Sequence, residues 1–161
     1  MSEAIQNVTQ NVTQNVIVES IHLAETSGSP MREVTSAVAE ENLGLVGDRH
    51  HGAPLRQVTV QAVGELADAS AACDLYIDPA LTRRNITISA DAVPQEIGHR
   101  WKIGAVELEV TKESAPCALM NEIFGEGAKE GMMTRGGVGN RVVKGGEIQV
   151  GDSVDFGTFA P

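Results

Sequence analysis

Aromatic residues are scarce in this chain: they make up 3 % of its 161 residues, against 42 % for the hydrophobic residues as a whole. The interior must therefore consist mainly of valine, isoleucine, leucine and alanine. Cysteine is also rare, because Cys73 and Cys117 are the only two. Two cysteines make neither a disulfide framework nor a four-ligand zinc site. We therefore expect a protein of a reducing, cytoplasmic compartment.

Long apolar runs and basic residues are lacking as well. No apolar run approaches the roughly 20 residues of a membrane helix, and no basic segment precedes an apolar one at the N-terminus. Lys and Arg number 12 against 22 Asp and Glu, a net charge of −10 at pH 7. Such a surface repels nucleic-acid phosphates, so we expect neither a membrane nor a nucleic-acid partner. Arginines still gather at Arg83 and Arg84 and at Arg135 and Arg141, where a small anion could bind.

Glycine is abundant, with 17 residues, as the tight turns of a β-rich fold require. Residues 61–72 show helical spacing of apolar residues, and a short helix is expected after Pro116. Alternating patterns predict strands at 16–23, 33–38, 56–60, 84–89, 101–103, 105–111, 141–144, 147–150 and 153–156. Strands thus outnumber helices, which predicts a mainly β fold: a closed or nearly closed β-barrel with a few short helices.

Two regions of the chain differ in composition. Within residues 1–15, Asn-Val-Thr-Gln repeats with a period of four, which suits neither a strand nor a helix face. We interpret residues 1–15 as a flexible low-complexity leader. Residues 16–158 are then predicted to form the domain itself.

Cys117 is the residue most suited to chemistry. The strand at 105–111 ends just before it, and the short helix is expected to begin with it. A thiol in the first helical turn is favoured as thiolate, which is both a nucleophile and a soft metal ligand. A buried structural cysteine is the alternative. Cys73, at the end of the longer helix, has the pattern of a small buried hydrophobic residue.

Three further segments carry polar or charged side chains at suggestive spacing. In a strand, Arg83 and Asn85 share one face, and a guanidinium beside an amide suits a phosphate or a heterocycle edge; a solvated arginine pair is the alternative. The glycines of residues 135–141 could direct N–H groups at an anion or form a plain hairpin loop. His50 and His51 follow Asp48, but adjacent strand residues point to opposite faces, so only one histidine could join a metal site.

In their order, these segments resemble the MOSC domain family, named after the C-terminal part of molybdenum-cofactor sulfurases. The resemblance implies a stand-alone, single-domain member with a β-barrel related to that of pyruvate kinase. It also implies binding of a molybdenum cofactor of the molybdopterin type. The segments that carry it are Gly44-Leu45-Val46-Gly47-Asp48-Arg49-His50, Arg56-Gln57-Val58-Thr59, Arg83-Arg84-Asn85-Ile86, Pro116-Cys117, Arg135-Gly136-Gly137-Val138 and the glycine-rich run that ends the domain.

The resemblance also implies roles for individual residues. Cys117 takes the role of metal ligand or sulfur carrier. Arg83 and Asn85 are expected to contact the phosphate and pterin of the cofactor, with Arg84 in the same binding segment. Arg135 and Gly136 are expected to shape the rim of the pocket.

Three functions remain open at this point. The first is an enzyme that reduces N-hydroxylated compounds with electrons from a donor protein, because the sequence shows no flavin, haem or iron–sulfur motif. The second is a carrier that receives sulfur from a cysteine desulfurase as a persulfide on Cys117, or that passes the cofactor on. The third is a non-catalytic barrel that has lost its site, which full burial of Cys117, with Arg83 facing away, would favour.

Overall fold

The computed structural model describes residues 15–157. The predicted leader of residues 1–15 therefore lies outside the described residues except for Asn15. The helical segments are α2 (Val63–Cys73), η1 (Pro79–Leu81, a 3-10 turn), α3 (Leu119–Phe124) and α4 (Ala128–Gly131). The strands are β1 (Val18–Leu23), β2 (Arg32–Val34), β3 (Ser36–Glu40), β4 (Gly44–Leu45), β5 (Val58–Ala62), β6 (Ile86–Ile88), β7 (Arg100–Ile103), β8 (Val106–Glu113), β9 (Val138–Lys144), β10 (Gly146–Gln149) and β11 (Val154–Asp155).

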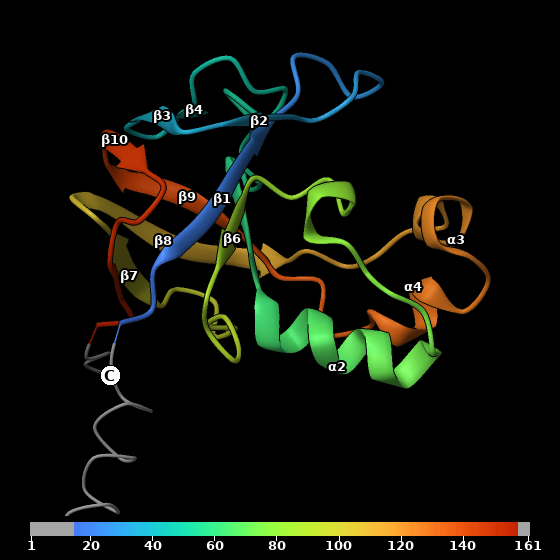
Figure 1. Ribbon diagram of the computed structural model, residues 1–161. Coiled ribbons are helices and arrows are strands. Elements are labelled where there is room, and N and C mark those ends of the chain that lie inside the picture. The colour runs from blue at the N-terminus through green and yellow to red at the C-terminus, as the bar shows by residue number, and fades with distance from the viewer. Residues whose placement is uncertain (1–14, 158–161) are drawn as a thin grey trace, which may run out of the picture.

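The strands form two sheets. The larger has eight strands in the order β11-β7-β8-β9-β5-β6-β1-β2, and the smaller has the order β10-β3-β4. Strands β5 and β6 are parallel, and a parallel pair requires a crossover connection, which α2 and η1 supply. Figure 1 shows α2 along one side of the strands, with α4 beside its C-terminal half and α3 next to α4. No helix in the described part of the chain is long and apolar enough to cross a membrane.

The mainly β fold with few helices is confirmed, but the predicted closure into a barrel is wrong. The larger sheet has two edge strands, β2 and β11. Strand β1 pairs with β2 at Ile21–Leu23, so this part of its outer edge is not available to β11. Near the other end of β1, an isolated bridge joins Ile17 to Ser153, and the N–H of Val154 donates to the carbonyl of Val16 at 2.9 Å. This short contact brings the ends of the sheet together without a continuous ladder.

The core is aliphatic, as the composition predicts. The main cluster consists mainly of buried residues from the strands of both sheets and includes Trp101, which is 1 % exposed. The indole of Trp101 stacks on Phe156 with 5.9 Å between ring centroids, and its Nε1 donates to Asn140 Oδ1 at 2.9 Å. A second cluster lies between α2, α3 and α4, and Cys73 packs half-buried against it.

Local periodicity predicted several elements well and missed some boundaries. The hairpin of β7 and β8 has the predicted alternation, with Val106, Leu108 and Val110 buried. The strand predicted at 33–38 is divided between β2 and β3. The glycine-rich segment at 135–141 passes into β9 at Val138, so its second half is a strand and not a loop.

Candidate functional site

Cys117 lies in the loop between β8 and α3, and its side chain is exposed. This exposure excludes the buried structural cysteine that the sequence left open. The helix begins at Leu119 and not at Cys117. Cys117 lies in the turn before the helix, where its carbonyl accepts a hydrogen bond from Met120 N at 3.0 Å. The argument from the first helical turn therefore does not apply. What distinguishes this thiol is its accessibility and the charge beside it.

That charge comes first from Arg84, which is buried at 8 % exposure. Its Nε donates to the Gly136 carbonyl at 2.8 Å, and its Nη2 donates to the Ser114 carbonyl at 2.9 Å. No carboxylate within residues 15–157 forms an ion pair with it. Burial lowers the pKa of Arg84 to about 10, with a further lowering from nearby arginines and an opposing effect of Cys117. Arg84 thus stays charged at neutral pH and ties the loop that carries Cys117 to the start of β6.

Three more arginines lie near Arg84, and together they form what we call the arginine cluster (Arg49, Arg56, Arg83 and Arg84). Arg49 donates through Nη2 to the Arg83 carbonyl at 2.9 Å, and burial lowers its pKa. Arg56 is half-buried, and its Nε has no hydrogen-bond partner. Arg49 also forms an ion pair with Asp48 Oδ1 at 3.3 Å, whereas the other three form none within the described residues. The cluster therefore carries net positive charge in a chain whose net charge is −10.

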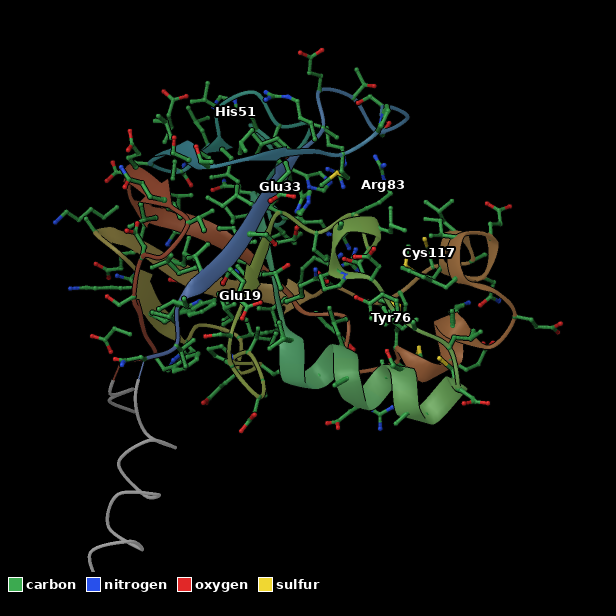
Figure 2. All side chains as sticks on the ribbon, viewed as in Figure 1. Glu19, Glu33, His51, Tyr76, Arg83 and Cys117 are labelled. Atoms are coloured by element: carbon green, nitrogen blue, oxygen red, sulfur yellow. The ribbon has the colours of Figure 1, made fainter. Side chains whose placement is uncertain are left out.

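Arg83 lies at the outer part of the cluster. Its φ of 65° is left-handed, so the strand alternation expected for residues 83–89 does not extend to it, and β6 begins at Ile86. Its Nη2 donates to the Ser27 carbonyl at 3.1 Å. Figure 2 shows Arg83 and Cys117 on the same side of the molecule. The full burial of Cys117 that a lost site would show is not observed.

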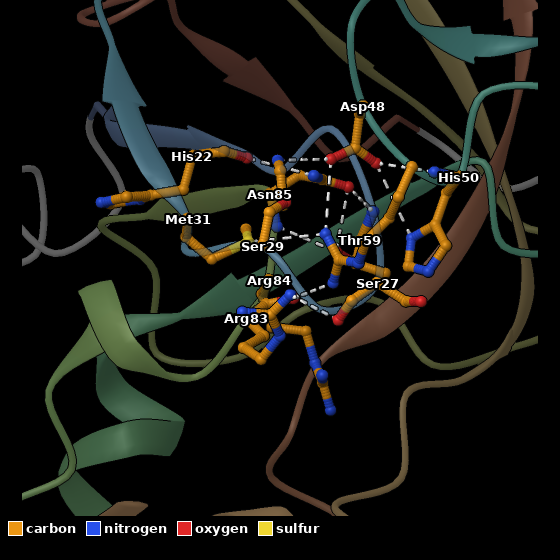
Figure 3. A network of polar contacts seen from close by, with 12 residues as sticks. His22, Ser27, Ser29, Met31, Asp48, His50, Thr59, Arg83, Arg84 and Asn85 are labelled. Carbon is orange, nitrogen blue, oxygen red and sulfur yellow. Dashed lines mark hydrogen bonds and ion pairs between the residues drawn. The ribbon is translucent and has the colours of Figure 1, made fainter.

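Asp48 and His50 border the cluster from the loop after β4 (Figure 3). Asp48 is buried, and its carboxylate accepts Ala24 N at 3.1 Å and His50 N at 3.1 Å. Burial is the main reason why the pKa of His50 is lowered to about 4, followed by the charge of Arg49. His51 instead reaches Glu40 Oε1 at 2.7 Å, so the two histidines have different surroundings, although they lie in a loop and not on the strand assumed from the sequence. Within residues 15–157, no group of three or more His, Cys, Asp or Glu could hold a metal ion.

Asn85 has a different environment from the one expected. It is fully buried, and its Oδ1 accepts hydrogen bonds from Thr59 N at 3.0 Å and Thr59 Oγ1 at 3.1 Å. Its Nδ2 donates to the His22 carbonyl at 3.1 Å. These bonds join β1, β5 and the start of β6, which holds Arg84 in place. Direct contact of Asn85 with a ligand stays a prediction.

Arg135 and Gly136 contact different parts of the molecule. Arg135 donates through Nη1 to the Gly131 carbonyl at 3.0 Å and acts electrostatically on Glu65, towards α2 and α4. Gly136 lies under the guanidinium of Arg84, and a Cβ there would come within 2.6 Å of the Ser114 carbonyl oxygen. Gly136 therefore helps to seat Arg84, and the part predicted for both residues at a pocket rim stays a prediction.

An apolar hollow lies beside Arg83. Its volume is about 190 Å³, and three segments line it: the loop before β2, the η1 segment and α3. Its lining residues are Pro30, Met31, Ala80, Leu81, Arg83 and Ile123. A cavity of about 150 Å³ accommodates a benzene ring, so the hollow has room for one small organic group.

Sequence reasoning missed several members of the site. Arg49, His50 and Arg56 stand within segments that carried the family resemblance, but Arg49 and Arg56 were assigned no role and His50 was considered only as a metal ligand. Ser114 is the fourth, with a buried Oγ that has no hydrogen-bond partner. The signal that could have found the arginines is their excess over acidic residues within residues 49–56, where Arg49 and Arg56 are accompanied by no Asp or Glu.

Comparisons with known proteins agree with this architecture. A family model described as MOSC domain matches residues 47–155. The YuaD protein from Bacillus subtilis has a similar structure, with a TM-score of 0.77 and 16 % identity over 88 % of this chain and 94 % of that chain. YiiM from Escherichia coli gives 0.65 and 16 % over 91 % and 71 %, and YiiM from Geobacillus stearothermophilus gives 0.65 and 11 % over 87 % and 74 %. At these identities the structural likeness shows the fold alone. No curated protein matches the chain.

Proposed function

Since the chain belongs to the MOSC domain family, we propose that it binds a molybdenum-pterin cofactor through the Cys117 thiolate and reduces N-hydroxylated compounds. One observation carries this proposal: Arg84 of the arginine cluster donates to the Ser114 and Ala115 carbonyls in the loop that presents the exposed thiol of Cys117. Cationic side chains in the fork geometry of guanidinium suit a phosphate group, and a thiolate suits a soft metal.

The polar atoms around the cluster fit an anionic, many-oxygen ligand. Arg56 Nε, His50 Nδ1 and Ser114 Oγ are buried, and none of them has a hydrogen-bond partner. A buried polar group without a partner costs free energy, on the order of 1–3 kcal/mol for each group. Arg84 is also buried without a counter-charge, which is more costly still. A bound phosphate monoester would offset both costs.

Each part of the site then has a defined task. The cofactor, when bound, supplies two-electron oxygen-atom chemistry. Cys117 is proposed as the metal ligand, and Arg56 and Arg84 as the phosphate-binding residues. The apolar hollow beside Arg83 is proposed to hold the carbon substituent of the substrate. The overall change, R–NHOH with two electrons and two protons to R–NH₂ and water, takes its electrons from an external donor protein.

The exposure of Cys117 also supports a second candidate function, that of a sulfur carrier. A partner as large as a cysteine desulfurase can reach an exposed thiol. The Cys117 thiolate would attack the outer sulfur of the donor's persulfide, and the donor cysteine would leave as thiolate. The product is a persulfide on Cys117, with no net oxidation or reduction.

Metal and pterin analysis tests the main proposal. The full chain is purified from a host that makes the cofactor, beside Cys117→Ala and the matched variant Cys73→Ala. We expect one molybdenum and one pterin per chain in the wild type and in Cys73→Ala, and loss of the molybdenum in Cys117→Ala. Equal molybdenum in all three, or none in the wild type, would contradict cofactor binding through Cys117.

The carrier function has its own readout. The chain is incubated with a cysteine desulfurase and cysteine and then analysed by mass spectrometry. A carrier gains the mass of one sulfur atom on the peptide that contains Cys117, and the Cys117→Ala variant does not. A wild-type chain that stays unmodified would exclude this role.

A further inference from the structure

The side chain of His50 is the group of the site whose bonding is least complete. Its Nδ1 is buried and has no hydrogen-bond partner, and it lies 3.8 Å from Asp48 Oδ2, beyond hydrogen-bond distance. The side chain as a whole is 22 % exposed, so it still reaches the surface of the site. Asp48 already accepts the backbone N–H groups of Ala24 and His50. The imidazole is thus held near a carboxylate without being bonded to it.

The charges around His50 oppose a proton on its ring. The titratable and charged groups that act on it are one acid, Asp48, and three bases, Arg49, Arg56 and Arg84. Burial is the largest cause that lowers the pKa of His50, to about 4, and the arginines add to it. The ring is therefore neutral at neutral pH while the arginine cluster holds no anion.

An oxyanion on the arginine cluster would reverse this balance. It would compensate the arginine charges that act on the ring, and its oxygens could accept a hydrogen bond from the ring. A proton from solvent would then leave a hydrogen on both ring nitrogens, and the positive ring would lie 3.8 Å from the Asp48 carboxylate. We propose that His50 contacts the anionic ligand of this site and takes up one proton when the ligand binds. The inference rests on the anion site of the proposed function and adds to it a residue and a proton.

The side chain of His50 can be changed without disturbing the loop that carries it. The bonds that His50 itself makes in the loop use its backbone, from its N–H to Asp48 and from Ala53 N–H to its carbonyl, and any residue except proline keeps both. His51 provides a matched control, because it is a neighbouring histidine whose ring contacts Glu40 instead. Glutamine suits both positions, since it retains a hydrogen-bonding side chain that does not titrate.

Calorimetric titration of the cofactor-free full chain with sulfate tests the proposal, because sulfate itself binds no proton near neutral pH. Measurements at about pH 6 in two buffers of different ionisation enthalpy give the protons taken up for each sulfate bound. For the wild type and His51→Gln we expect roughly half to one proton, and binding about 10-fold tighter at pH 5.5 than at pH 7.5. For His50→Gln we expect sulfate binding without proton uptake and with little dependence on pH.

The outcomes separate this inference from the proposed function. Proton uptake that is unchanged in His50→Gln, or absent in the wild type while sulfate binds, would overturn the role of His50 and leave the anion site standing. A wild-type chain that binds no sulfate would instead overturn the anion site. Circular dichroism and thermal unfolding of each variant verify that the fold is retained.

Discussion

Replacement of Arg84 by methionine tests how the site is held together. Methionine fills a similar volume but removes the bonds to the Gly136 and Ser114 carbonyls, which are 2.8 and 2.9 Å long. A hydrogen bond from a charged group contributes about 1.5–3 kcal/mol, so these two contribute about 3–6 kcal/mol. Burial of the charge opposes this, because a pKa lowered from 12.5 to about 10 corresponds to about 3 kcal/mol. The difference between these two effects is about 0–3 kcal/mol. The Gly136 and Ser114 carbonyls, which belong to buried residues and would lose this donor, raise the expected net loss of unfolding free energy to about 1–3 kcal/mol.

The neighbouring substitution Arg83→Met is the matched control, since it removes the same charge one residue away. Arg83 is half-buried and donates to the exposed carbonyl of Ser27, so its loss should cost less than about 1 kcal/mol. Urea unfolding of the full chain measures the free energy of unfolding of both variants. In thermal unfolding, each 1 kcal/mol lost should lower the melting temperature by about 2–4 °C. If Arg84→Met is as stable as the wild type, or both variants lose the same stability, then Arg84 does not hold the Cys117 loop as we infer.

Three further predictions follow from the geometry. Urea unfolding of Gly136→Ala should show a loss of about 1–3 kcal/mol in unfolding free energy, because the new Cβ would lie 2.6 Å from a backbone oxygen. The control Gly28→Ala, whose Cβ would have nothing within 4 Å, should change the unfolding free energy by less than about 0.5 kcal/mol, and similar losses in both variants would refute the steric argument. The pKa of His50 is lowered from 6.5 to about 4, so the stability that depends on its neutral ring is fully present above pH 6.5 and is lost as the pH falls towards 4. The free energy of unfolding should therefore drop by about 1–2 kcal/mol from pH 7 to 5, and a His50→Gln chain that keeps the whole drop would contradict this origin. Iodoacetamide should modify the exposed Cys117 before the half-buried Cys73, as peptide mass spectrometry would show, and the reverse order would disprove the exposure of the site thiol.

Local patterns predicted those features that depend on neighbouring residues. The alternation of Val106, Leu108 and Val110 predicted a strand with one buried face, and the structure confirms it. The order of glycines, arginines and Cys117 along the chain predicted the family, which the match over residues 47–155 confirms. Side-chain period and motif order are properties of the chain itself, so no tertiary contact is needed to recognise them.

Other predictions failed because they depend on contacts between distant segments. Strand alternation placed Arg83 and Asn85 on one face, but the left-handed backbone at Arg83 interrupts the strand, and Asn85 bonds to Thr59 and His22 within the sheet. The barrel was predicted from the number of strands. Its closure depends instead on which strand occupies the outer edge of β1, and β2 occupies much of it.

By itself, the sequence determined that this is a mainly β member of its family and singled out Cys117 as the candidate reactive thiol. Only the tertiary structure decided which arginine lies buried beside that thiol. Arg84 is buried because the carbonyls of Ser114 and Gly136, which lie 30 and 52 residues further along the chain, converge on its guanidinium. The pKa of a side chain depends on such converging groups and on its burial, and neither is encoded in the spacing of residues along one segment. For the same reason, the surroundings that keep His50 neutral became evident only once the chain was folded.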